Sequence, residues 1–276
     1  MFKFTGANEK PLIIPVFIPH LGCPQICAFC NQRAVSGIEE PSPDSIEKTV
    51  RDYLSWSKKR EIVEISFFGG SFTAIPFEKM MQYINKGLEF INEGSVHSLR
   101  CSTRPDAIDK NIAKILKENR FGTVELGVQS LSGRLLEKMK RGHSVDDVFN
   151  AVRILKKAGI KTVVQLMTGY PHETENDHEV TIEKLGKLKP DAIRIYPFIP
   201  LENTDISSEI NSGKIKILKS ELVLERTAEL FTASMELSIP VIRIGLPVTE
   251  NVPDIYPHNM YQAVISKAIE KLAEKG

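Results

Sequence analysis

The chain has 276 residues, of which 42% are hydrophobic and 26% are charged, and its formal net charge is +1. These values support a large apolar core and exclude a mainly disordered chain, which would be poor in apolar residues and highly charged. They also give no overall basic surface of the kind that binds nucleic acid. No apolar run approaches the roughly 18 residues of a membrane span, and the N-terminus lacks the apolar segment of a signal peptide. We therefore expect a cytoplasmic protein with no membrane partner.

Short apolar runs alternate along the chain with stretches of helical periodicity. The runs predict strands at Leu12–Ile18, Val63–Phe68, Ser98–Ser102, Thr123–Val128, Thr162–Met167 and Ala192–Tyr196, with a further short strand at Val241–Leu246. A predicted helix follows each of the first six strands, and a last helix is expected at Gln262–Ala273. Ser144 and Asp147 have the spacing of a capping pair, which predicts where one of these helices begins.

This alternation predicts an α/β fold. Six strand–helix units whose strands are rich in Val and Ile are typical of a parallel sheet covered by helices. A complete barrel of eight units takes about 250 residues, so six units with appendages fit this chain. We expect a partial (β/α)6 TIM-like barrel over residues 1–250 and a short C-terminal helical extension over residues 251–276. In such sheets the chemistry lies at the carboxyl ends of the strands.

Three cysteines follow the first predicted strand. Cys23, Cys27 and Cys30 have the spacing C-x3-C-x2-C, with Phe29 directly before the last of them. Three thiolates on one short loop can each bind a different iron of a cubane cluster, which leaves the fourth iron open to an outside ligand. The competing interpretation is a structural zinc site, which would need a fourth ligand from the distant fourth cysteine or from a histidine. The remaining interpretation is three unconnected buried cysteines.

Further motifs stand at the ends of the next predicted strands. Gly69 and Gly70 follow the second strand in the sequence Phe-Gly-Gly-Ser-Phe, and glycines there allow a ligand to approach the backbone. Later come Thr-Arg-Pro-Asp at 103–106, Gly-Val-Gln-Ser at 127–130 and Arg-Gly-His at 141–143. Each motif alone is compatible with an ordinary turn or loop, so the informative feature is their order on successive strand–helix units.

Taken together, the motifs resemble those of the radical S-adenosylmethionine (SAM) superfamily. The nearer group is the radical SAM part of the Elongator catalytic subunit, which modifies wobble uridine in tRNA and whose pattern includes all of these motifs. Oxygen-independent coproporphyrinogen oxidase shares the cysteine loop, the Gly-Val-Gln-Ser segment and the helix–strand order. The resemblance covers about residues 10–250. It implies a partial radical SAM barrel that holds a [4Fe–4S] cluster on the three cysteines and binds SAM at the open iron.

The resemblance also implies roles for individual residues. Gly69 and Gly70 would contact the methionine amino group of SAM, and Phe29 belongs to the cofactor-binding loop. Gln129 would lie near the ribose and carboxylate of SAM. Arg141 would reach that carboxylate, where a guanidinium can make a two-pronged contact.

Two positions depart from the family pattern, and three others are expected near the substrate. Gln165 stands where the porphyrin enzymes have an aspartate that binds the ribose hydroxyls, which an amide can also do, and Ser102 stands where both groups have a glutamate. Arg194 and Tyr196 resemble the Leu-Tyr-Pro segment of the Elongator family. We expect both, with Arg243 on a later strand, to face the substrate; the alternative is an ion pair or a rim contact.

The resemblance predicts an enzyme that reductively cleaves SAM to a 5′-deoxyadenosyl radical, with tRNA and an electron donor as partners. The Elongator subunit carries an acetyltransferase domain after its barrel, whereas this chain ends at Gly276. We therefore expect modification of a tRNA uridine without that domain. One alternative is a radical SAM enzyme for a small molecule such as a tetrapyrrole, and another is a non-enzymatic metal-binding module.

Overall fold

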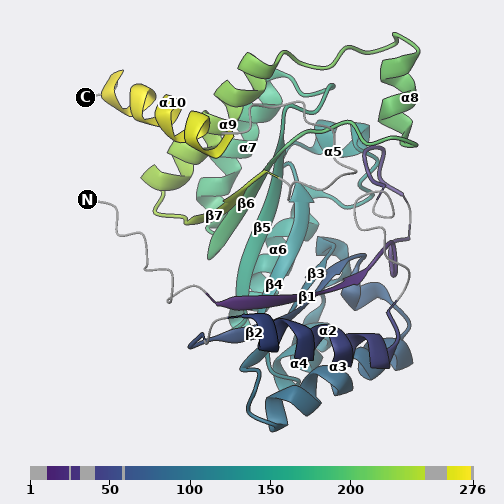
Figure 1. The fold of residues 1–276 in the computed structure, drawn as a ribbon. Coiled ribbons are helices and arrows are strands. Elements are labelled where there is room, and N and C mark those ends of the chain that lie inside the picture. Colours follow the sequence, from purple (N-terminus) through teal and green to yellow (C-terminus); the bar gives the residue numbers. More distant parts are fainter. Residues whose placement is uncertain (1–10, 25, 32–40, 58–59, 246–259, 275–276) are drawn as a thin grey trace.

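The computed structural model describes residues 11–24, 26–31, 41–57, 60–245 and 260–274. Its centre is a sheet of seven parallel strands whose order follows the sequence. The strands are β1 (Leu12–Ile18), β2 (Val63–Gly69), β3 (Ser98–Thr103), β4 (Phe121–Gln129), β5 (Lys161–Thr168), β6 (Ala192–Pro197) and β7 (Val241–Ile244). Figure 1 shows the sheet strongly curled, with β1 crossing the view at a steep angle to β5 and β6. The fold is α/β, a partial TIM-like barrel, as predicted.

The first six strands lie within two residues of their predicted bounds. The seventh is a short strand that pairs in parallel with β6, so it continues the sheet. Its predicted end at Leu246 lies outside the described residues, and so does the predicted domain boundary at residue 250. The division into a barrel and an extension therefore stays a prediction.

Helices connect successive strands, and one more follows the last strand. They are α2 (Pro43–Trp56), α3 (Phe77–Asn92), α4 (Lys110–Glu118), α5 (Gly133–Lys138), α6 (Val145–Lys157), α7 (Glu175–Leu188), α8 (Asp205–Asn211), α9 (Ser220–Glu236) and α10 (Met260–Glu274). The expected pair Ser144 and Asp147 forms a reciprocal capping box at the start of α6. Two short helices, α5 and α8, were not expected from the sequence, and both lie in the upper right of Figure 1. They matter because they pack against the cysteine loop.

Two apolar clusters hold these elements together. The larger lies between the sheet and its helices, and within it the rings of Phe67 and Phe72 stack with centroids 4.6 Å apart. The smaller joins the α5 region, the β5–α7 loop and α8, and Phe29 of the cysteine loop packs against it. The buried members of this smaller cluster are Leu135, Met139, Tyr170, Phe198 and Ile206. The cysteine loop is therefore supported by a core of its own.

The C-terminal helix α10 packs along α9. Val264 and Ala268 are buried on its inner side, and Lys271 Nζ lies 2.8 Å from Glu229 Oε1 of α9. The predicted C-terminal helix thus packs on α9 through an apolar face. Among the described residues, no helix is both long and apolar enough to cross a membrane.

Candidate functional site

A pocket opens at the carboxyl ends of strands β2 to β5, beside the cysteine loop. It is lined by His20, Cys23, Ile26, Cys27, Phe29, Cys30, Gly69, Gly70, Ser71, Ser102, Thr103, Arg104, Gly127, Gln129, Arg141 and Gln165. Every residue that the sequence assigned to the cluster or to SAM is in this lining. The five motifs, which are spread over about 120 residues of chain, therefore meet around one space.

The cysteine loop is held against the end of β2 by close backbone contacts. The amide of Gly70 donates to the Ile18 carbonyl at 2.9 Å, and the amide of Ser71 donates to the Leu21 carbonyl at 2.7 Å. A Cβ at Gly70 would lie 2.0 Å from the Leu21 oxygen, and one at Gly22 would lie 2.3 Å from the Ser71 oxygen. Both positions must therefore be glycine for the loop to approach the strand.

Gly69 has a different reason to be glycine. Its φ of +106° lies in a region that residues with a side chain rarely adopt, and the turn lets the chain leave β2 beneath the cysteine loop. Both glycines line the pocket, and their expected contact with the SAM amino group stays a prediction.

All three cysteines line the pocket. Cys27 is buried, while Cys23 and Cys30 are partly exposed. The Cys23 thiol lies 3.9 Å from the Ser71 hydroxyl, and burial raises the pKa of this thiol although that contact opposes the rise. Within the described part of the chain, no three His, Cys, Asp or Glu side chains are grouped as ligands of a single ion would be.

Arg141 reaches into the pocket from the loop between α5 and α6. One terminal nitrogen donates to the Cys27 sulfur at 2.9 Å, and the other donates to the Gly127 carbonyl. The side chain is buried, and its Nε atom has no partner among the described residues. A buried guanidinium with an unused donor suits an anionic ligand.

Gln129 owes its place in the pocket to an irregularity in β4. The pairing of β4 with β5 shifts register between Gly127 and Gln129, and Gln129 has a φ of +71°. Such a bulge re-aims a side chain, and the Gln129 side chain lies in the pocket wall instead of continuing the strand pattern. Gly127 was the only local signal for this bulge.

Phe29 is half-buried in the pocket wall and packs on the smaller apolar cluster. Its ring meets Tyr170 edge to face at a centroid distance of 6.2 Å. The backbone beside it is also tied down, since the Ala28 amide donates to Met139 at 3.0 Å and its carbonyl accepts from Ile206 at 2.9 Å. Phe29 thus joins the cysteine loop to α5 and α8.

A buried polar network lies inside the curled sheet next to the pocket. Glu125, with no exposed surface, accepts hydrogen bonds from Arg100 at 2.7 Å, Arg194 at 2.9 Å and Gln165 at 2.9 Å. Arg100 also donates to Glu64 at 2.9 Å. These residues come from five neighbouring strands, β2 to β6, and their charges balance.

The residues expected to face a substrate lie in or near this network. Arg194 is 8% exposed, and its guanidinium also lies over the Phe68 ring of β2, 5.9 Å from the centroid. Burial raises the pKa of Tyr196, and Arg243 Nε donates to the Gly245 carbonyl at 3.1 Å. None of Arg194, Tyr196 and Arg243 lines the pocket in the described structure, so their contact with a substrate stays a prediction.

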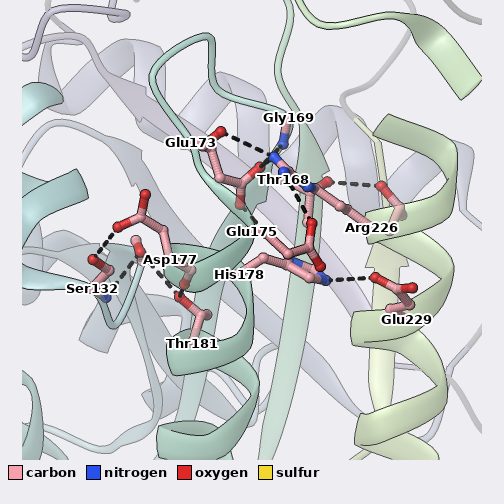
Figure 2. Close-up of polar contacts among 12 residues, drawn as sticks. Ser132, Thr168, Gly169, Glu173, Glu175, Asp177, His178, Thr181, Arg226 and Glu229 are labelled. Atoms are coloured by element: carbon pink, nitrogen blue, oxygen red, sulfur yellow. Dashed lines mark hydrogen bonds and ion pairs between the residues drawn. The ribbon is translucent and has the colours of Figure 1, made fainter. Parts of the chain in front are cut away.

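Sequence reasoning missed a second polar cluster, which holds the β5–α7 loop. Figure 2 shows Glu173 of this loop facing Arg226 of α9. Glu173 Oε2 accepts from the Gly169 amide at 2.7 Å and from Arg226 at 3.0 Å. His178 of α7 lies between this carboxylate and Glu229, with Nε2 3.2 Å from Glu229 Oε2. The available signal was the cap sequence at Thr174, which marks where α7 begins.

A model of the radical SAM superfamily matches residues 17–185. The chain belongs to the radical SAM superfamily. The tRNA uridine(34) acetyltransferase of Methanocaldococcus infernus is 33% identical over 184 residues, which are 59% of this chain and 34% of that protein. The chain thus spans about a third of the length of this relative.

Two solved structures show the same fold. An archaeal Elp3 from Methanocaldococcus infernus, with residues 1–46 deleted, superposes with a TM-score of 0.76 at 20% identity, over 96% of this chain and 64% of that one. Coproporphyrinogen III oxidase of Escherichia coli, a radical SAM enzyme, gives a TM-score of 0.61 at 17% identity, over 83% of this chain and 54% of that one.

As a radical SAM protein, the chain has a [4Fe–4S] cluster and SAM as its cofactors. The pocket suits both. Three thiols of one loop line it, and the unused donor of buried Arg141 suits the SAM carboxylate. When bound, SAM supplies a 5′-deoxyadenosyl radical on reduction by the cluster.

Proposed function

We propose that this chain is a radical SAM enzyme that modifies RNA, with a uridine of tRNA as its target. The observation that carries the proposal is the 33% identity to a tRNA uridine(34) acetyltransferase over 59% of this chain. The structural likeness to archaeal Elp3 shows only the fold and adds no evidence on substrate. The proposal covers the radical step alone, because the chain spans about a third of that relative.

In this proposal, the pocket residues that the sequence motifs indicated bind or position the cofactors. Cys23, Cys27 and Cys30 hold the cluster, and Arg141 keeps a positive charge beside Cys27 and binds the SAM carboxylate. The amides of Gln129 and Gln165 bind the ribose side of SAM, as their place in the pocket wall allows. Gly69, Gly70 and Phe29 shape the wall and orient the cysteine loop.

The test is anaerobic turnover of the reconstituted protein with a reductant, with and without bulk tRNA. We expect SAM to be cleaved to 5′-deoxyadenosine, cleavage to increase with tRNA, and tRNA binding to weaken as salt rises. Cys27→Ala should abolish the cluster, whereas Cys101→Ala is the matched control. Cys101 is fully buried in the core, and burial raises its pKa far above the ordinary thiol value, so it should not affect the cluster.

Each contrary result has a distinct meaning. The RNA proposal is overturned if tRNA does not change the rate of SAM cleavage and if tRNA nucleosides are unchanged in a deletion strain. Under that result, tetrapyrrole binding at the pocket would support the small-molecule alternative. A colourless protein that takes up zinc and no iron would instead support a metal-binding module and contradict an enzyme.

A further inference from the structure

Gln165 has an amide whose two ends have opposite hydrogen-bonding character. Its Nε2 group donates and its Oε1 atom accepts, and rotation of the amide by half a turn exchanges them. Gln165 is half-buried, comes from β5 and lines the pocket. The orientation of the Gln165 amide therefore decides whether a hydrogen-bond donor or an acceptor faces the pocket.

Glu125 fixes it. Its Oε2 atom lies 2.9 Å from Gln165 Nε2, and a carboxylate that receives two guanidinium groups offers only acceptors. The atom of Gln165 that faces Glu125 must therefore be the donor, and the flipped amide would set two acceptors against each other. In the described part of the chain, no donor reaches Gln165 Oε1, which leaves this oxygen for the pocket.

The carboxylate itself cannot turn away. Glu125 has no exposed surface, and its Oε1 atom is held from two sides by Arg100 of β3 and Arg194 of β6. Moving the carboxylate would break one of the two ion pairs of Arg100 and the ion pair that the buried Arg194 makes, which is costly. The network thus makes the orientation of the Gln165 amide a property of the strand framework.

We propose that Glu125 is a positioning residue that holds the Gln165 carbonyl oxygen toward the pocket, where it accepts hydrogen bonds from the ribose hydroxyls of SAM. The inference rests on the SAM contact of Gln165 in the proposed function. Ribose hydroxyls donate readily to a fixed acceptor, so Glu125 makes SAM binding depend on those hydroxyls without touching SAM.

The experiment measures anaerobic binding to the reconstituted protein without reductant, so that SAM is not cleaved. Two ligands are compared, SAM and its 2′,3′-dideoxy analogue, which lacks both ribose hydroxyls. We expect wild-type protein to prefer SAM, and Glu125→Gln to weaken SAM binding about three- to ten-fold while leaving the analogue unchanged. Gln165→Leu should remove the same preference.

Glu64→Gln is the matched control. Glu64 is a buried carboxylate that also receives Arg100, at 2.9 Å, but it has no contact with Gln165. It should keep the preference for the hydroxyls. If the network has only a structural role, Glu125→Gln and Glu64→Gln should both weaken the binding of SAM and of the dideoxy analogue by the same factor. That result would overturn the proposal.

A second variant covers the case in which Glu125→Gln alone does not fold. Combining Glu125→Gln with Gln165→Glu keeps the net charge of the network and reverses the hydrogen bond, with a carboxylate oxygen now toward the pocket. We expect the double variant to prefer SAM again. If the double variant or the wild-type protein does not prefer SAM over the dideoxy analogue, the inference about Glu125 is overturned, but the RNA proposal is not. If tRNA nucleosides are unchanged in a deletion strain, the RNA proposal is overturned, but the inference about Glu125 is not.

Discussion

A single backbone contact determines whether the cysteine loop can reach the pocket. Gly70 ends the Gly-Gly turn with its Cα facing the Leu21 carbonyl, and a Cβ there would lie 2.0 Å from that oxygen. The contact involves backbone on both sides, so neither partner can move aside as a flexible side chain would. The resulting strain would fall on the loop that carries all three cysteines.

We predict that Gly70→Ala destabilises the protein by about 1–3 kcal/mol, the range for overpacking, and lowers its iron content after reconstitution. Gly133→Ala is the matched control, because no atom lies within 4 Å of a Cβ built there and the residue begins α5. It should stay within about 0.5 kcal/mol of wild type. Chemical unfolding and iron analysis measure both effects, and equal loss in the two variants would contradict the steric account.

At the scale of elements, the β5–α7 loop is held to α9 by buried charges. Figure 2 shows the Glu173 carboxylate between the Gly169 amide and Arg226, with His178 and Glu229 beside them. Tyr170 of the same loop meets Phe29 of the cysteine loop. The charged cluster holds the β5–α7 loop in place, and the contact between Tyr170 and Phe29 connects this loop to the pocket wall.

The charge state of His178 should make this support depend on pH. Burial lowers the pKa of His178, but Glu173 and Glu229 outweigh burial and raise it to about 9. Since the unfolded value is about 6.5, the charged imidazole contributes stability that is complete below about pH 6.5 and is lost as pH rises through 9. One unit of pKa difference corresponds to about 1.4 kcal/mol, so the effect is on the order of 3 kcal/mol.

We therefore predict that the melting temperature of wild-type protein falls between about pH 6.5 and 9, and that His178→Gln flattens this fall. The matched control is His172→Gln, in which the lost imidazole is partly exposed beside Glu209 at 3.1 Å. It should leave the slope almost unchanged, because partly exposed ion pairs contribute little. Equal slopes for wild type and His178→Gln would show that His178 is not the titrating group.

At the scale of the whole molecule, the sequence was informative wherever the signal was local. Strands, the α6 cap and the strand-end motifs all follow from patterns within a few residues, and the parallel topology then brings the motifs to one edge. The contacts that tune the site join distant residues and could not be predicted. Glu125 and Arg194 are 69 residues apart, and Arg141 and Cys27 are 114 apart. These pairs form only because the folded barrel points their side chains toward each other. The bulge at Gln129 likewise sets a side-chain direction that the sequence pattern does not predict.

The last prediction concerns how the cluster stabilises the molecule. A cluster binds the folded loop and not the unfolded chain, so its removal should loosen whatever the loop contacts. Ala28 connects the loop to Met139 and Ile206, which lie next to α5 and at the start of α8. Hydrogen exchange should therefore accelerate in residues 26–31, around Met139 and in α8 when iron is chelated, while α4, which packs against β4 and α6, keeps its protection. Uniform acceleration would mean that the cluster stabilises the barrel as a single unit, and unchanged exchange at Ile206 would mean that the cysteine loop is held independently of α8.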